Sequence, residues 1–381
     1  MKDPFPIAPP EALINLTQPI ATALSLPTLP LHVHEVIFAF FFYNFVNVVL
    51  SPWLSRTFFP STYTSFNRRT RINWDVHVVS FFQSVIICAL SLYVIWFDEE
   101  RKETRPREAW EQRIWEYSGL SGLLQSFALG YFLWDFIMCT VHVDIFGWGM
   151  LAHAISALSV FALGYRPFIY FYAPVFLLYE LSSPFLNIHW FCDKLKLTGS
   201  IYQAINGAFL TFTFFACRII WGNISSVYVF QDVYKGVFRG NTTPLSKPHH
   251  LADVPVSSYT AKDLLAIYND EQGQRFAFAG QERFIPLWLG AIYLASNIVL
   301  NSLNIWWFGK MVQTIRSRFA PPFGTKGQAK EVHYEPKERV RMQGSPRQSE
   351  DEIKVHKVVE ADGSRGIEME GQRTLRTRRK A

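Results

Sequence analysis

The sequence carries little charge for its length, and that charge is unevenly distributed. Charged residues make up 18% of the 381 residues, whereas an average soluble domain has roughly 25%. Between the charged blocks lie nearly uncharged stretches of about 18–25 residues, the helix length that crosses a hydrocarbon core ~30 Å thick. This pattern excludes a soluble protein of one or two domains and predicts an all-α fold, a polytopic bundle of transmembrane helices.

Several common signatures are absent. None of the four cysteines shows CxxC spacing, so we expect neither a disulfide framework nor a metal site. The P-loop, GxSxG and HExxH signatures do not occur, which excludes the common nucleotide, hydrolase and metalloprotease interpretations and leaves no cofactor to predict. The N-terminal residues lack a basic region followed by an apolar region and a cleavage site, so we expect no cleaved signal peptide.

Hydropathy predicts seven spans. Their approximate limits are Val33–Leu54, Trp74–Phe97, Tyr117–Thr140, Trp148–Tyr165, Phe168–Trp190, Ile201–Trp221 and Phe284–Phe308. The fourth span is short, and a re-entrant course for it would leave six. Eight of the twelve tryptophans lie near these limits, where an amphipathic indole prefers the headgroup level.

The segments outside the spans predict the topology. Segments 55–73, 141–147, 191–200 and 309–381 hold 23 Lys and Arg, against 13 in the segments of the opposite side. The positive-inside rule therefore favours a lumenal N-terminus and a cytosolic C-terminus. The basic tail is more typical of a topology determinant, or of contact with anionic lipid, than of nucleic-acid binding.

The same analysis predicts a domain organisation. Residues 1–32 are rich in proline and are expected to form a disordered lumenal segment, followed by a first transmembrane anchor at 33–54. Residues 223–283 are expected to be a polar lumenal insertion, and 320–381 a disordered basic cytosolic tail. The sequons at Asn15 and Asn241 then fall on the lumenal side and are the expected glycosylation sites, whereas the sequon at Asn223 lies too near the membrane.

Polar residues inside the predicted spans are the candidate functional residues, because an ionisable side chain in hydrocarbon costs at least ~2.5–3.5 kcal/mol and usually faces a bundle interior or a cavity. Helical spacing places several of them in narrow stripes. Pro184 should kink the fifth span and leave the carbonyl of Glu180 without a backbone partner. The expected cavity residues are His77, Asp135, His142, His153, Glu180, Ser183 and Asn187. Interhelical hydrogen bonds that only hold the bundle together are the alternative.

Four motifs resemble the TLC (TRAM–Lag–CLN) domain. They are Asn73-Trp74 leading into His77-Val-Val-Ser80, Gly130-Tyr-Phe-Leu-Trp-Asp135, His153 with Ser156, and Glu180-Leu-Ser-Ser-Pro-Phe-Leu-Asn187 with Trp190. The resemblance covers about 67–318, which we interpret as a TLC-type transmembrane domain. It implies a multi-helix protein of the endoplasmic reticulum membrane linked to lipid handling. Family members range from ceramide synthases, which join acyl-CoA and a sphingoid base, to regulators of lipid composition and translocation factors.

The chain departs from the ceramide synthases at two positions. Those enzymes resemble one another in an adjacent pair of histidines, where this chain has His153 followed by Ala154. A second histidine of those enzymes corresponds here to Gln83. The sequence therefore resembles the branch of TLC proteins outside the ceramide synthases.

The resemblance and the polar stripes together lead to one expected function and two alternatives. We expect a role in lipid homeostasis, through binding or sensing a membrane lipid (a sphingolipid, a fatty acyl chain or a phospholipid) within the bundle. One alternative is a membrane acyltransferase that carries out N-acylation with acyl-CoA, with His153 as the base and Asp135 as its partner. The other is a cargo or translocon adaptor that works through the basic tail. The sequence leaves open whether the protein is an enzyme, and favours binding.

Overall fold

The computed structural model describes most of residues 2–317 and two short strands of the tail. The described ranges are 2–166, 168–239, 247, 251, 253–270, 275–279, 283, 285–317, 356–359 and 365–368. Residues 1–318 form one compact unit and residues 319–381 another, and each is described by itself.

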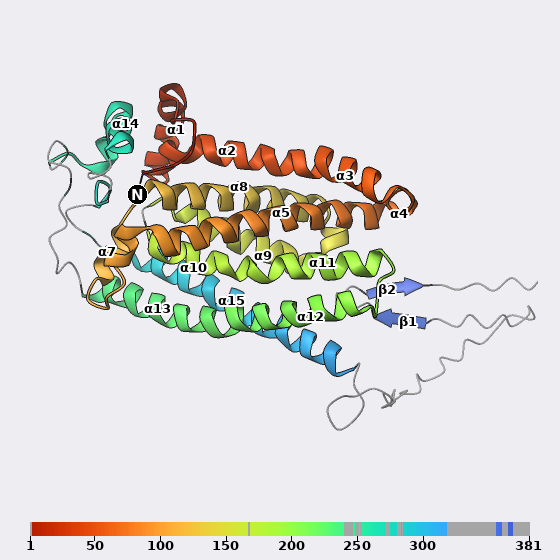
Figure 1. The fold of residues 1–381 in the computed structure, drawn as a ribbon. Coiled ribbons are helices and arrows are strands. Elements are labelled where there is room, and N and C mark those ends of the chain that lie inside the picture. The colour runs from red at the N-terminus through yellow and green to blue at the C-terminus, as the bar shows by residue number, and fades with distance from the viewer. Residues whose placement is uncertain are drawn as a thin grey trace, which may run out of the picture. The chain divides into compact units, whose positions relative to one another are not determined.

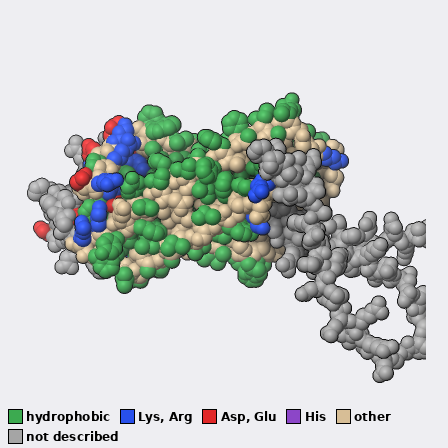
Figure 2. All heavy atoms as spheres, turned by 90° about the horizontal axis from the view of Figure 1, so that it is seen from below, with side chains coloured by type: hydrophobic (Ala, Val, Ile, Leu, Met, Phe, Trp, Pro, Cys, Tyr) green, Lys and Arg blue, Asp and Glu red, His purple; other side chains and the backbone are tan. Residues whose placement is uncertain are grey.

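The first unit is a bundle of long helices, which confirms the predicted all-α fold (Figure 1). Within the described residues, six helical segments are long and apolar enough to cross a membrane. They are Leu29–Phe58 (α2 to α3), α5 (Arg68–Phe97), α8 (Gly119–Val141), α9 (Val143–Leu163), Ile201–Phe238 (α12 to α13) and α15 (Leu287–Arg316). On the face shown in Figure 2, hydrophobic side chains cover the middle of the bundle and charged side chains gather at its two ends. The protein is therefore a multi-pass membrane protein.

Two of these segments contain a wider π-helical turn. Residues Val46–Leu50 join α2 (Leu29–Phe45) to α3 (Ser51–Phe58). Residues Phe215–Trp221 join α12 (Ile201–Phe214) to α13 (Gly222–Phe238). Such turns are rare and are frequent at functional sites, and the second one contains the only arginine that the sequence places inside a predicted span.

The predicted fifth span is divided into short helical pieces. It consists of 3-10 turns at Tyr170–Tyr172 and Leu178–Ser182 and of the helices α10 (Ala173–Leu177) and α11 (Ser183–Lys194). Pro174 and Pro184 stand in the first turns of α10 and α11, where a missing N–H is tolerated. Both short helices pack against α5, so the segment follows the length of the bundle in pieces. Helix α9 has a kink at Gly147, whose φ of 80° is not helical, and the predicted fourth span follows this kink as helix from Trp148 to Leu163.

The N-terminal residues are ordered, so the prediction of a disordered segment 1–32 is wrong for the residues described. Helix α1 (Glu11–Ala23) buries Ile14 and Ala21, and Ile14 packs in one apolar cluster with Leu264 and Ile267 of α14 (Ala261–Asn269). Proline content suggested disorder, but a helix whose apolar face has a partner is stabilised by that packing rather than by its own propensity.

The predicted insertion 223–283 is also shorter than expected, because α13 continues the helix to Phe238. Its polar residue Asp232 is buried and accepts hydrogen bonds from Arg113 Nε (2.7 Å) and the Tyr172 hydroxyl (2.6 Å). Burial by itself would lower the pKa of Arg113, but the hydrogen-bonded Asp232 carboxylate raises it above its usual value. The polar residues of this stretch therefore mark an internal interface and not a loop.

The remaining elements are short. At the ends of the bundle lie α4 (Pro60–Ser65), α6 (Glu99–Glu103), α7 (Trp110–Trp115) and a 3-10 turn at Val256–Ser258. In the tail, β1 (His356–Val359) pairs antiparallel with β2 (Arg365–Glu368). The rest of the tail 320–381 lies outside the described residues, and its disorder stays a prediction.

Close packing of α2 against α8 depends on Gly130. A Cβ atom at this position would lie 2.6 Å from the Ala39 Cβ and 2.9 Å from the backbone nitrogen of Phe40. Neither atom belongs to a flexible side chain, so any side chain on residue 130 would push the two helices apart.

We therefore expect Gly130→Ala to lower the free energy of unfolding by ~1–3 kcal/mol, the usual cost of overpacking. Gly149→Ala is the matched control, since a Cβ at Gly149 meets nothing within 4 Å, and it should be neutral or slightly stabilising. Thermal unfolding of both variants in detergent tests this; equal stability of the two would contradict the packing described.

Candidate functional site

Arg218 lies at the centre of the candidate site. This buried residue belongs to the π-helical turn Phe215–Trp221. Its Nε donates to the carbonyl oxygen of Tyr179 (2.7 Å), its Nη1 to Asn304 Oδ1 (3.2 Å) and its Nη2 to Ser183 Oγ (3.3 Å). One guanidinium group thus joins the 3-10 turn before α11, α11 itself and α15.

Glu180 supplies a negative charge next to this guanidinium. Its Oε1 lies 3.6 Å from Arg218 Nη2, and its Oε2 accepts a hydrogen bond from Ser183 Oγ (2.6 Å). The sequence predicted a carbonyl without a backbone partner before Pro184. That prediction is wrong for Glu180, because its carbonyl accepts a hydrogen bond from the backbone N–H of Ser183 at the end of the 3-10 turn Leu178–Ser182. The carbonyl that receives the Arg218 side chain is that of Tyr179.

His77 and Asn187 form a second group. His77 Nδ1 lies 2.7 Å from Asn187 Oδ1, and Asn187 Nδ2 donates to Ser80 Oγ at 3.1 Å. The His77 ring stacks on Trp190, with 4.2 Å between the ring centroids. His77 and Ser80 of α5 and Asn187 of α11 therefore face each other across one helix interface, and of these His77 and Asn187 were predicted cavity residues.

His153 lies beside the first group. The charges of Glu180 and Arg218 both act on it, and its ring contacts Trp307 of α15 with 6.0 Å between centroids. Its Nδ1 is shielded from solvent and has no hydrogen-bond partner among the described residues. The same holds for Asn304 Nδ2, one helical turn before Trp307. Two polar atoms without partners thus lie on facing helices next to the charge pair.

Asp135 is buried in α8, and its hydrogen-bond partner is Cys139 Sγ at 3.6 Å. In the part of the chain that the structure describes, no hydrogen bond joins Asp135 to His153. Tyr131, one turn earlier on α8, interacts with the charges of Asp135 and Glu180. Asp135 thus lies within electrostatic reach of Glu180 but does not form the predicted dyad with His153.

Among the described residues, no hydrogen bond, ion pair or ring contact joins His142 to the other predicted cavity residues, and its place in the cavity stays a prediction. Helix α8 ends at Val141, and the half-buried His142 follows it at the junction with α9. The predicted stripe through Asp135 and His142 assumed that the helix continues for seven residues, and it ends before the stripe is complete.

Two central residues, Arg218 and Asn304, were missed as site residues by sequence reasoning. A lone arginine in an apolar span was the available signal for Arg218. Asn304 had no such signal, because neutral amides are common in helices. Of the predicted glycosylation sites, Asn15 is exposed on α1 and Asn241 lies outside the described residues. The Asn223 side chain bonds the Ile219 carbonyl within its helix.

The family model of the TLC domain (TRAM, LAG1, CLN8) matches residues 73–313. This range covers all the residues of the site described above. The chain belongs to the TLC-domain family.

Two fungal proteins match more than three quarters of the chain. An uncharacterised TLC domain-containing protein of Schizosaccharomyces pombe is 33% identical over 309 residues, 81% of this chain and 87% of the relative. Topoisomerase I damage affected protein 4 of Saccharomyces cerevisiae is 29% identical over 302 residues, 77% of this chain and 88% of the relative. TLC domain-containing protein 4 of Homo sapiens is 29% identical over 198 residues, 50% of this chain and 72% of the relative. These relatives are not ceramide synthases, which confirms the predicted branch. No solved structure gives a significant match.

We expect Arg218→Gln to lower the free energy of unfolding by about 1–3 kcal/mol, because it leaves the partly buried Glu180 carboxylate without its cation and takes a donor from the Tyr179 carbonyl. The double variant Glu180→Gln/Arg218→Gln should recover part of this loss, since both charges are then removed. Unfolding in detergent measures both effects. Arg316→Gln, at an exposed position of α15, is the control; a loss in Arg218→Gln no larger than in this control would show that the charge pair is not coupled.

Proposed function

We propose that this TLC-family protein binds the polar part of a membrane lipid between α9 and α15 and acts in lipid homeostasis in the endoplasmic reticulum. The observation that carries the proposal is the pair of atoms without protein partners, His153 Nδ1 and Asn304 Nδ2, beside Arg218 and Glu180. A buried polar atom without a partner costs about 1–3 kcal/mol of folding free energy. A ligand that hydrogen-bonds both atoms recovers this cost at each of them, which favours its binding.

The chemistry of these atoms suggests the kind of ligand. Asn304 Nδ2 can only donate, and an imidazole Nδ1 donates or accepts according to its tautomer. An ester, amide or hydroxyl oxygen of a lipid suits both. The Arg218 guanidinium is already bonded to three partners and near Glu180, so a neutral polar group fits better than a strongly charged one.

Loose packing of α9 supports access from the membrane. Of the residues of α9, which the structure describes throughout, only Ala154 and Ala157 are buried. Large apolar side chains of the same helix, Trp148 and Ile155, are exposed and would face acyl chains. A lipid could therefore reach His153 laterally, with its tails left in the bilayer.

The acyltransferase alternative is less well supported by the geometry. It requires a base held by a partner group, and the predicted partner of His153, Asp135, bonds Cys139 instead. The carboxylate near His153 is that of Glu180, which already accepts a hydrogen bond from Ser183. The adaptor alternative rests on the tail, most of which lies outside the described residues.

Lipid content of the purified protein tests the proposal. We expect mass spectrometry to find a bound lipid whose occupancy falls about five- to tenfold in His153→Ala, as for the loss of one hydrogen bond of ~1–1.4 kcal/mol. His142→Ala, a histidine at the end of a span, should keep the wild-type occupancy. Unchanged occupancy in His153→Ala would contradict the proposal. Release of CoA from acyl-CoA and an amine acceptor by the pure protein would favour the enzyme.

We also propose that the N-terminus is lumenal and the C-terminus cytosolic. Support comes from the bundle end that carries α4 and the connection between α11 and α12, which is also where α15 ends (Figure 1). This end holds the basic residues Arg56, Arg68, Arg69, Arg71, Lys194 and Lys196, and Lys310 and Arg316 of α15. The positive-inside rule places it in the cytosol.

An epitope after Ala381 should then be digested by protease added to sealed microsomes. Endoglycosidase should shift the mobility of the wild type, and the shift should disappear in a variant with both Asn15→Gln and Asn241→Gln. A protected epitope would reverse the proposed orientation, whatever the glycan result.

A further inference from the structure

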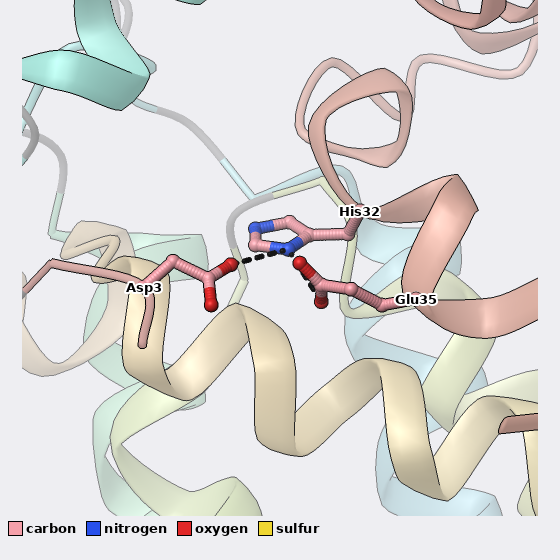
Figure 3. A group of neighbouring side chains, drawn as sticks. All are labelled: Asp3, His32 and Glu35. Atoms are coloured by element: carbon pink, nitrogen blue, oxygen red, sulfur yellow. Dashed lines mark hydrogen bonds and ion pairs between the residues drawn. The ribbon is translucent and has the colours of Figure 1, made fainter. Parts of the chain in front are cut away.

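Three side chains at the N-terminal end of the bundle form a buried cluster, shown in Figure 3. Asp3 comes from the segment before α1, and His32 and Glu35 from the first turns of α2. His32 Nδ1 lies 3.0 Å from Glu35 Oε2 and 3.5 Å from Asp3 Oδ2. All three residues are buried, with His32 and Glu35 fully inaccessible to solvent.

The basic groups that the described residues place beside these two carboxyl groups are imidazoles: His32 Nδ1 and, 3.7 Å from Glu35 Oε1, His34 Nε2. Asp3 Oδ2 and Glu35 Oε1 are shielded from solvent and have no hydrogen-bond partner among the described residues. The other nearby base, His34, uses its Nε2 for the carbonyl oxygen of Ile7 (2.9 Å). Two buried carboxyl groups beside one imidazole stay ionised only when a cation pairs with them, and otherwise they take up protons.

His32 is oriented as a metal ligand would be. Its Nε2 lies 2.7 Å from the Tyr117 hydroxyl, on the side away from the carboxylates, and its Nδ1 points toward them. A metal-bound histidine almost always uses its second nitrogen in such a bond, which fixes the ring and its tautomer. Gly122 of α8 makes room for the ring, since a Cβ there would lie 2.1 Å from His32 Nε2.

We propose that Asp3, His32 and Glu35 bind one divalent transition-metal ion, with zinc as the ion that fits best. The three ligand atoms lie within 4.8 Å of one another, and ligands ~2.0–2.1 Å from a tetrahedral zinc lie about 3.4 Å apart, close to the distances from His32 Nδ1. One nitrogen and two carboxylate ligands suit zinc, and also manganese or iron. The two positive charges of a divalent ion would balance the two negative charges of the carboxylates.

The ion would fasten the start of the chain to the bundle. Asp3 lies before α1 and the other two ligands belong to α2, while Gly119 of α8 touches Asp3 so closely that a Cβ would lie 2.5 Å from its backbone nitrogen. Spacing rules for Cys and His clusters do not detect such a site, because one ligand is an aspartate 29 positions before the histidine. The inference is independent of the lipid proposal, since the two sites share no residue.

The test uses the full chain without an N-terminal tag and with a C-terminal tag that contains no histidines. Elemental analysis of protein incubated with zinc and then desalted should give about one zinc per chain. Asp3→Asn, His32→Gln and Glu35→Gln should each lower the content at least tenfold. The matched controls Asp144→Asn and His142→Gln, an exposed carboxylate and a half-buried imidazole of another bundle end, should keep it.

A second measurement uses only the wild-type protein, so it does not depend on the folding of variants. A chelator should lower the melting temperature and expose the N-terminal segment to protease, and zinc should restore both. A proton shared by the two carboxylates is the rival account. It predicts no stoichiometric zinc and no effect of chelator, and either result would overturn the proposal, as would full zinc content in Asp3→Asn.

Discussion

The middle of this bundle is organised around the hydrogen bonds that one guanidinium group makes inside the membrane. Arg218 lies in a helix that is otherwise apolar enough to cross a membrane, and hydrocarbon offers its donors no partners. The broken span supplies them: the carbonyl of Tyr179 and the side chains of Glu180 and Ser183 lie where the backbone leaves regular α-helical geometry. The break at Pro184 and the arginine are thus two parts of one arrangement.

The spans could be predicted from the sequence because hydropathy reports contact with lipid directly. The same measure failed where polar residues find partners inside the protein. Asp232 made the end of α13 look like a loop, yet it is paired with Arg113. The first thirty residues looked disordered because of their prolines, yet Asp3 and Ile14 are buried against other elements. Hydropathy is a property of single residues, so it cannot report the tertiary contacts that order these segments.

The candidate site could be predicted one helix at a time, but not across helices. Helical spacing correctly placed His77 and Ser80 on one face, and both contact Asn187 or its neighbours. Spacing does not say which helix that face meets, so Asp135 was paired with His153 although its bond goes to Cys139. Spacing also assumes that a helix continues. It therefore placed His142 on the stripe of Asp135, although α8 ends at Val141.

The surroundings of His153 favour holding a polar group over moving protons. Ceramide synthases resemble one another in a second histidine next to this position, but here Ala154 is fully buried and has no group that titrates. Neighbouring helix positions point about 100° apart, so Ala154 packs inward while the His153 ring meets Trp307. The carboxylate that could orient the imidazole, Glu180, is held by Ser183 and lies beside Arg218. A general base gains a positive charge when it takes a proton, so it needs a neighbouring group that stabilises the charged form. A binding site needs only donors and acceptors in fixed positions. The fixed network around Arg218 meets the second requirement.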